Sequence, residues 1–326
     1  GFIKKMLPAK TAKTFNLPRN MAFDAKVNAR GKQYFGNVFL KESGGNIYAK
    51  GSYNTANDVY ALTVRANNFH INHFVPNEDI KPFTGTIVMS GHGTDFLNPK
   101  SALRLKLNIG KFAFGKYVLD GFGGDISLNS GIANAHIVST NKMIGGNFTY
   151  RGKLSDKAID GRLRGWLRRI DLKRLGVMKD PWVVSTWADV NVKSNLKDYH
   201  FIKGPVRHFS LTSEERHGTK KLIAGDFDVV VNMIGKQLDT HLKGNLDYAN
   251  LKALGVMDKQ YVVKTDANIH FHSNMKDTYK VEGYLGKLRI NEHRGKDIIA
   301  LFAGDLNINA DMKGKYLAGS TNGNVQ

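Results

Sequence analysis

The sequence predicts a mainly all-β protein built from repeated antiparallel strands, with short helical turns. Polar and apolar residues alternate with a period of two along most of the chain, and helical periodicity is nearly absent. Gly, Asn and Asp gather between the alternating runs, as hairpin turns require. Segments of the sequence also recur at a fixed spacing, which is typical of repeat architectures.

The repeat is clearest in one short motif. Leu-Lys-Arg-Leu-Gly-Val-Met at 172–178 returns as Leu-Lys-Ala-Leu-Gly-Val-Met at 251–257, a shift of 254 − 175 = 79 positions. A glycine that starts a strand keeps this spacing twice, at Gly146, Gly225 and Gly304. A looser copy lies upstream, because residues 44–51 resemble residues 145–152 at a shift of 145 − 44 = 101. The chain is therefore predicted to be an array of similar units.

The first unit is predicted to be longer than the others. From Phe74 to Gly146 is 146 − 74 = 72 positions, whereas from Leu175 to Gly225 is 225 − 175 = 50. The difference of 72 − 50 = 22 residues is about the length of one additional hairpin, and an added pair of strands leaves the chain direction unchanged. We expect roughly five strands in each 79-residue unit. The predicted organisation is the end of a preceding β unit at 1–44, a first, longer repeat at 45–145, repeats at 146–224 and 225–303, and a truncated fourth repeat at 304–326.

Each predicted strand has an apolar face and a polar face. Val184, Ala188 and Val192 fall on one side of a strand, while Asp189 and Asn191 fall on the other, and the run at 263–272 repeats this pattern. The apolar side of a sheet must be covered to be stable. A second sheet, a solenoid wound inward, or a trough whose apolar interior meets something other than protein would each cover it. The alternation alone does not separate these three solutions.

The composition bounds the environment of the chain. Lys and Arg exceed Asp and Glu by 48 − 28 = 20, which makes polyanions such as nucleic acid, anionic headgroups or lipopolysaccharide candidate neighbours. Disulfides and thiolate metal sites are excluded because there is no Cys, a composition weakly consistent with an oxidising compartment such as the periplasm. No apolar run is long enough for a membrane-spanning helix. Because the chain begins without Met and stops soon after Gly304, we expect it to be a piece of a longer protein.

The densest positive charge lies at 162–169. Arg162, Arg164 and Arg168 share a face opposite Leu163 and Leu167. A solvated outer face that resists edge aggregation is the favoured interpretation, ahead of contact with anionic headgroups or nucleic acid. A dedicated nucleic-acid stripe should not lose its charge in the next copy, yet the equivalent strand at 239–247 is mixed in charge.

Other polar-face residues are candidate binding sites. His270 and His272 share a strand face at a spacing that can hold a metal, but the pattern places no carboxylate or third histidine nearby, so surface histidines are favoured. Trp166 and Trp187 also lie on the polar face, where packing against a neighbouring strand or loop is favoured over a ligand platform. No hydrolase, metalloprotease or phosphate-loop motif is present. We expect no enzyme activity, no catalytic residues, no metal site and no cofactor.

Several of these segments resemble a known family. The Asp-Leu-Lys-x-Leu-Gly-Val segment follows a Gly-x-Leu-x-x-Ile-Asp strand at 165–171, and the strand start Gly-Asp/Asn-Phe/Leu recurs. With the stretch Phe15–Asp24, these features resemble the AsmA/TamB group of Gram-negative envelope proteins. The resemblance runs from Phe15 to the end of the chain. It implies a long curled β trough in the periplasm, with one continuous apolar β-groove that carries phospholipid from the inner toward the outer membrane.

The resemblance also implies partners. Full-length members are anchored in the inner membrane and meet an outer-membrane partner, and we expect both contacts to involve regions absent from this chain. Phospholipid is the expected ligand, and no specific nucleic acid is expected. The alternative comes from another class: a structural or adhesive surface protein made of stacked β units, whose apolar face is a closed core.

Physical chemistry indicates which residues would line such a groove. Moving a lipid through water exposes its acyl chains at a cost of about 0.8 kcal/mol per CH₂, and an apolar trough removes most of that cost. The residues expected to line it are the apolar members of the alternating strands. They are Leu105, Leu107, Leu163, Leu167, Val190, Val192, Phe227, Val229, Leu242, Leu246, Ile269 and Phe271.

Overall fold

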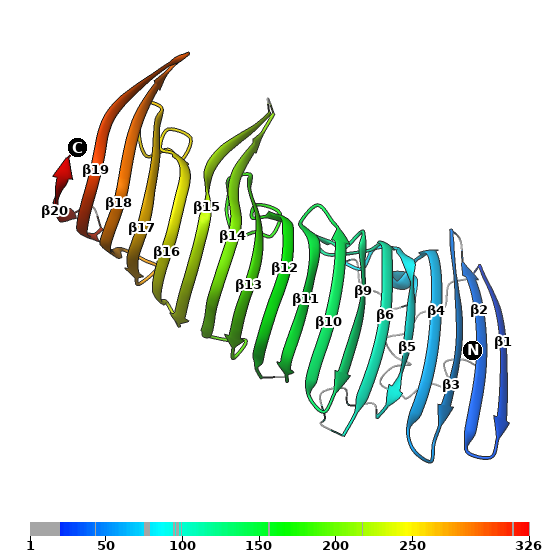
Figure 1. The fold of residues 1–326 in the computed structure, drawn as a ribbon. Helices are drawn as coiled ribbons and strands as arrows, with labels where there is room; N and C mark the ends of the chain where they lie inside the picture. Colours follow the sequence, from blue (N-terminus) through cyan, green and yellow to red (C-terminus); the bar gives the residue numbers. More distant parts are fainter. Residues whose placement is uncertain are drawn as a thin grey trace. The chain divides into compact units, whose positions relative to one another are not determined.

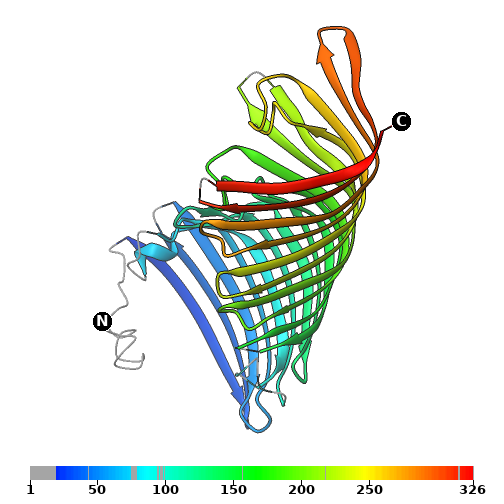
Figure 2. The same cartoon turned by 90° about the vertical axis from the view of Figure 1, so that its left-hand side faces the viewer.

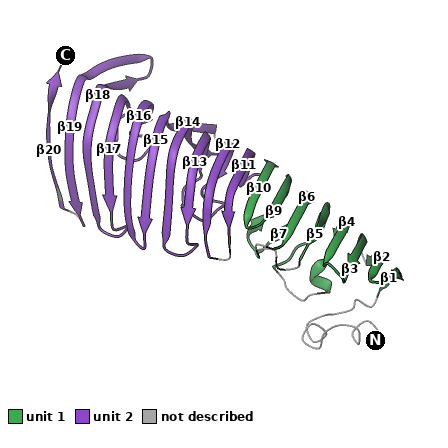
Figure 3. Cartoon of the chain, turned by 60° about the horizontal axis from the view of Figure 1, so that its bottom comes forward, with its two compact units in different colours: residues 1–141 green, residues 142–326 purple. Residues whose placement is uncertain are grey.

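The computed structural model describes residues 20–42, 44–74, 79–93, 95, 98, 100–155, 157–216, 218–314 and 316–325. About three quarters of them lie in β-strands, which confirms the predicted all-β class. The one helical element among them is a 3₁₀ helix, η1 (Ile71–His73), and that part of the chain has no helix able to cross a membrane. The chain divides into two compact units, Gly1–Asn141 and Lys142–Gln326, coloured separately in Figure 3.

Unit 1 is an antiparallel meander in which each strand pairs with the next along the chain (Figure 1). A small β7–β8 hairpin (Ala113–Phe114 and Tyr117–Val118) lies in the connection between its sixth and seventh strands. The strands in order are β1 (Met21–Arg30), β2 (Gln33–Glu42), β3 (Gly45–Asn54), β4 (Val59–Phe69), β5 (Phe83–His92), β6 (Ala102–Lys111), β9 (Phe122–Asn129) and β10 (Ile132–Thr140).

Unit 2 continues the same pattern with ten antiparallel strands. They are β11 (Ile144–Leu154), β12 (Ile159–Asp171), β13 (Trp182–Ser194), β14 (Tyr199–Glu215), β15 (Gly218–Ile234), β16 (Gln237–Asn250), β17 (Tyr261–Ser273), β18 (Thr278–Arg294), β19 (Asp297–Lys313) and β20 (Tyr316–Val325). In Figure 2 the strands of this unit, drawn green to red, curve along their length. The sheet of unit 2 therefore has a concave face and a convex face.

The sequence repeat maps onto whole strands. A shift of 254 − 175 = 79 positions carries β12 to β16, β13 to β17, β14 to β18 and β15 to β19. One period is therefore four strands, and the predicted five is wrong, because β14, β15, β18 and β19 each run to 17 residues. The extra hairpin of the first unit is confirmed: β5, β6, β9 and β10 separate η1 from β11, whereas only β13 and β14 separate 172–178 from β15.

The recurring glycine begins a strand only at Gly45; Gly146, Gly225 and Gly304 lie within β11, β15 and β19, so their prediction as strand starts is wrong. The recurrence of glycine has a steric cause. A Cβ at Gly225 would lie 2.2 Å from the carbonyl oxygen of Asn245 in the next strand, and one at Gly45 would lie 2.0 Å from that of Asn68. Gly146 and Gly304 show the same approach, and the strand register shifts at Gly146 and Gly225. Each copy therefore needs glycine where the neighbouring backbone comes closest, a common use of glycine at β-bulges.

The Leu-x-x-Leu-Gly-Val segments form single capped turns, as predicted. The Leu175 N–H donates to the Asp171 carbonyl 3.0 Å away, which closes one helical turn. The Asp171 side chain accepts a hydrogen bond from the Arg174 N–H at 2.9 Å, as an N-cap does. Gly176 has a φ of 75° and ends the turn, with the Val177 N–H bonded back to the Leu172 carbonyl at 2.9 Å. The second copy repeats these bonds at 250–256.

In unit 1 a small core lies where η1 folds onto the sheet. Phe69 and Phe74 stack with ring centroids 5.2 Å apart, and Phe83 and Ala66 complete the buried cluster. Partly buried side chains from the sheet pack against it, including Leu40 and Ile87. Elsewhere, each described strand packs mainly against its neighbours in the meander, and no second sheet or long helix of the described residues covers the sheet.

Candidate apolar groove

The strand register in unit 2 brings predicted groove residues into one row. Leu163 lies opposite Val190, and Val229 lies opposite Leu242, which in turn lies opposite Ile269. Gly204 of β14 lies between the two halves of the row, because it is the partner of Val229 and a Cβ added to it would lie 3.0 Å from the Cα of Val190. Directly opposed residues of a sheet point to the same face. The five predicted side chains therefore form a continuous apolar row across β12 to β17.

The other predicted residues of unit 2 lie in parallel rows on this face. Val192 faces Ile202, and Phe271 faces Thr240. Phe227 faces Gly244, whose partner in β17 is Ala267. Leu167 and Leu246 face the equivalent threonines Thr186 and Thr265. All ten predicted residues of this unit therefore share one face, as the alternation indicates.

Unit 1 presents a similar apolar face with a hollow in it. The two residues predicted there, Leu105 and Leu107, lie opposite Met89 and Ile87. Met89 lines a hollow of about 510 Å³ that extends across β1 to β5. The strand register puts most of the apolar residues of this lining on the same face as Leu105, while Phe35 and Ala61 lie on the other face. They include Val27, Tyr34, Val38, Ala49, Tyr53 and Leu62.

The two faces of the unit 2 sheet differ in exposure. Leu163 and Leu167 are partly buried although no described layer covers them, whereas Arg162, Arg164 and Arg168 are exposed. Side chains converge on the inner side of a curved sheet and spread on its outer side. We infer that the apolar rows of unit 2 occupy the concave side. No described layer covers these rows, although Val190 and Phe227 are only 5% and 6% exposed. An apolar face without a covering layer is unusual on a soluble protein and marks a binding surface.

The basic stretch at 162–169 is largely matched by acids on the polar face. The Arg162 guanidinium bonds Asp189 through two nitrogens, and Arg164 lies 3.6 Å from the same carboxylate. The hydrogen bond from Arg162 holds the pKa of Asp189 below its usual range. Arg169 bonds both carboxylate oxygens of Glu214 at 2.6 Å. These pairs support the interpretation of a solvated outer face.

Trp166 and Trp187 pack within the polar face. They are opposed across β12 and β13, and the Trp166 ring stacks on His208 of β14 with centroids 5.5 Å apart. The Arg164 guanidinium lies over the Trp187 ring at 5.8 Å. Both tryptophans therefore contact neighbouring strands, as expected.

The surroundings of His270 and His272 correct one expectation. The His272 ring nitrogen Nδ1 lies 2.8 Å from the Asp239 carboxylate, and the His270 ring stacks on His241 with centroids 4.1 Å apart. The expectation that no carboxylate or third histidine lies nearby is therefore wrong. The pattern of one strand does not reveal its register with the next, and that register brings β16 residues opposite β17.

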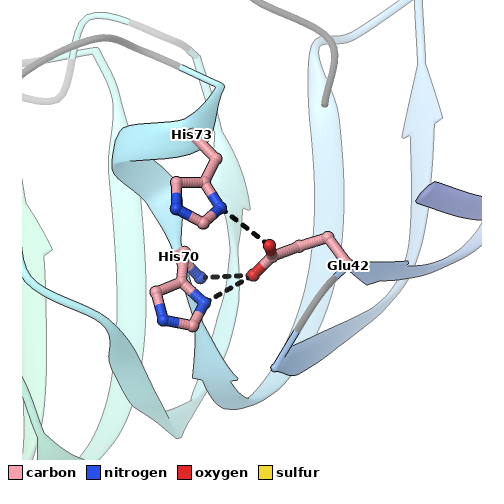
Figure 4. Close-up of side chains that lie close together, drawn as sticks. All are labelled: Glu42, His70 and His73. Carbon is pink, nitrogen blue, oxygen red and sulfur yellow. Dashed lines mark hydrogen bonds and ion pairs between the residues drawn. The ribbon is translucent and has the colours of Figure 1, made fainter. Parts of the chain in front are cut away.

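The alternation of polar and apolar residues does not predict one polar cluster around a buried carboxylate. In unit 1 the Glu42 carboxylate lies beside the stacked rings of His70 and His73 and bonds one nitrogen of each (Figure 4). The sequence signal for it is faint: His-x-x-His stands where the next copy has Asp171 and Arg174. None of the three residues of this cluster is among the predicted groove residues.

Comparison of the chain with protein-family models, with curated proteins and with solved structures found no match. The class of protein is therefore defined by the fold itself: an open, antiparallel β-repeat protein whose apolar face is covered, by the described residues, only where η1 packs on unit 1.

Proposed function

We propose that this chain is a segment of a periplasmic lipid-transfer conduit that carries phospholipid between the inner and outer membranes. The observation that carries the proposal is the apolar face, which is in register over β12 to β17 and is left uncovered by the described residues. In unit 1 the same kind of face holds a hollow of about 510 Å³. Acyl chains are the ligand that such a surface suits best, because their burial needs no polar partner.

The proposed mechanism is partition and sliding, without covalent chemistry. Acyl chains lie on the apolar rows, and headgroups stay toward the wetter rim of the trough. Transfer along the rows is inexpensive because one apolar contact replaces another. The excess of 48 − 28 = 20 positive charges favours anionic phosphate groups near the protein surface.

The resemblance to the AsmA/TamB group supports the same proposal and supplies the cellular setting. In that setting the full-length protein is anchored in the inner membrane and docks with an outer-membrane partner through other regions. The rival proposal, a structural or adhesive protein with a closed core, needs a layer that seals the apolar face. The described residues supply no such layer.

Lipid analysis of the purified protein tests the proposal. The chain is purified without detergent, extracted with organic solvent, and the extract is identified by mass spectrometry. Phospholipid is expected in a reproducible molar ratio to protein, above the amount carried by a β-protein of similar charge. A lipid-free protein that associates through the apolar face into stable oligomers would instead support the closed-core alternative.

A further inference from the structure

The geometry points to a divalent transition-metal site in unit 1, formed by Glu42, His70 and His73 (Figure 4). The His70 Nδ1 lies 2.6 Å from Glu42 Oε1, and the His73 Nδ1 lies 2.8 Å from Glu42 Oε2. One ligand atom from each residue lies within 4.8 Å of the other two. The site is independent of the proposed lipid function, since none of its residues belongs to the predicted groove.

Two elements hold the three side chains together. Glu42 is the last residue of β2, His70 is the N-cap of η1, and His73 is the last residue of η1. The His70 backbone N–H also donates to Glu42 Oε1 at 3.1 Å, which fixes the carboxylate beside the two rings. Supporting hydrogen bonds of this kind orient metal ligands in known sites.

The burial of Glu42 calls for a reason. Its side chain is 0% exposed, whereas those of His70 and His73 are 23% and 38% exposed. A carboxylate taken out of water is costly unless charged or hydrogen-bonding partners compensate it. The histidines supply two of those partners.

The other copies show that the fold does not require this polar cluster. Shifts of 145 − 44 = 101 and then 254 − 175 = 79 place Met143 and Leu222 at the position of Glu42. Both are buried, with Met143 4% and Leu222 0% exposed. The positions of the two histidines are filled by Asp171 and Arg174, and then by Asn250 and Ala253. The first copy thus has the carboxylate together with both imidazoles, whereas the later copies have an apolar residue in place of Glu42 and no histidine at the other two positions.

The donor set selects the class of ion. Two imidazole nitrogens and one carboxylate oxygen are ligands of Zn²⁺ and of neighbouring divalent transition metals, whereas Ca²⁺ and Mg²⁺ prefer oxygen alone. Bonds to Zn²⁺ of about 2.0–2.2 Å in a tetrahedral site place ligand atoms about 3.3 Å apart. The two imidazole rings are stacked with centroids 4.7 Å apart. They need to tilt so that each distance from a histidine Nδ1 to its Glu42 oxygen increases by roughly half an ångström. The metal then takes the place of the protons that bridge the three side chains.

A bound ion would fasten η1 to the end of β2. Phe69 and Phe74 flank the two histidines and belong to the small core of unit 1. Metal binding to the folded state alone raises its stability by mass action. The site would therefore clamp the segment that covers one end of the apolar face.

Metal titration of the intact, chelator-treated chain tests the site. Zn²⁺ binding is followed by calorimetry, and Co²⁺ binding by its visible absorption. One ion per chain is expected, together with a rise in the melting temperature on adding Zn²⁺. His73→Ala and Glu42→Met should each weaken binding at least about tenfold. Glu42→Met is expected to fold because methionine stands at the equivalent position 143.

The paired histidines of the polar face provide the matched control. His270→Ala with His272→Ala removes two imidazoles without touching the site, so affinity and stoichiometry should stay as in the parent chain. The proposal is overturned if the parent chain binds no Zn²⁺, if Glu42→Met and His73→Ala bind as tightly as the parent, or if the control double variant abolishes binding. Any of these results leaves Glu42, His70 and His73 as a hydrogen-bonded structural cluster.

Discussion

Leu242 of β16 lies directly opposite Ile269 of β17 on the apolar face, and the next pair along these strands, Lys243 and Asn268, lies on the other face. A step of one residue therefore changes the face that a side chain presents. This relationship allows a charge to be moved from one face to the other with almost no change of position.

Leu242→Glu should deplete bound lipid, whereas Lys243→Glu should not. A carboxylate in the apolar row would have to be desolvated under an acyl chain, which is unfavourable. We expect several-fold less phospholipid per mole of purified Leu242→Glu, measured as lipid phosphorus. Equal lipid content in the two variants would contradict a role for this face.

The recurring glycines should be intolerant of a side chain. Gly45→Ala should lower the free energy of unfolding by about 1–3 kcal/mol, because its Cβ would lie 2.0 Å from the Asn68 carbonyl oxygen. Gly36→Ala is the control in the same unit, since its nearest neighbour would be 4.0 Å away, and it should change stability by less than about 0.5 kcal/mol. Urea denaturation of both variants measures the difference, and equal effects would refute the steric explanation.

The N-cap of the second helical turn, Asn250, should contribute measurably to the free energy of unfolding. Asn250→Ala removes the acceptor of the Ala253 N–H, at 3.0 Å, and should cost about 1 kcal/mol of unfolding free energy. Asn250→Asp keeps a side-chain oxygen at this position, as Asp171 does in the previous copy, and should cost less. Thermal denaturation compares the two variants. If Ala and Asp are equally tolerated, the cap does not stabilise the turn.

The Arg162–Asp189 pair should make stability depend on pH. Because hydrogen bonding lowers the pKa of Asp189 in the folded chain, its contribution is present above the ordinary value of 3.8 and is lost as the pH falls through the lower folded value. Asp189→Asn should therefore cost up to about 1 kcal/mol at neutral pH, and this difference should shrink on acidification below 3.8.

Urea midpoints across this pH range measure the effect of Asp189→Asn. Asp180→Asn is the control, because that side chain is exposed and makes no hydrogen bond or ion pair with the described residues. A loss of stability in Asp189→Asn that does not vary with pH would show that packing, rather than charge, is responsible.

Local patterns in the sequence predict most features of the fold. The alternation at 184–192 predicts which side chains of β13 share a face, and the spacing of Gly146 and Gly225 predicts the repeat. The 22 additional residues of the first copy predict its extra hairpin, since strand lengths are similar throughout that region. These features depend on neighbours in the sequence, so the sequence alone reveals them.

Such patterns do not predict features that depend on the register between strands. The pairing of His272 with Asp239 and the stacking of His270 on His241 join residues of different strands. The Glu42 cluster joins residues 73 − 42 = 31 positions apart, because η1 folds onto the sheet beside the end of β2. The number of strands per period also required the structure, because the length of β14 depends on how far its hairpin extends past its neighbours.

Site-specific photo-crosslinking at Ile269 and Asn268 tests the proposed lipid conduit most directly. The two residues are adjacent in β17, partly buried on the apolar face and exposed on the polar face respectively. The same photoreactive amino acid is placed at each position, cells are irradiated, and phospholipid attached to the purified protein is identified by mass spectrometry. The lipid-conduit proposal predicts phospholipid adducts at Ile269 and few or none at Asn268. Equal labelling of the two positions, or adducts at Asn268 alone, would contradict it.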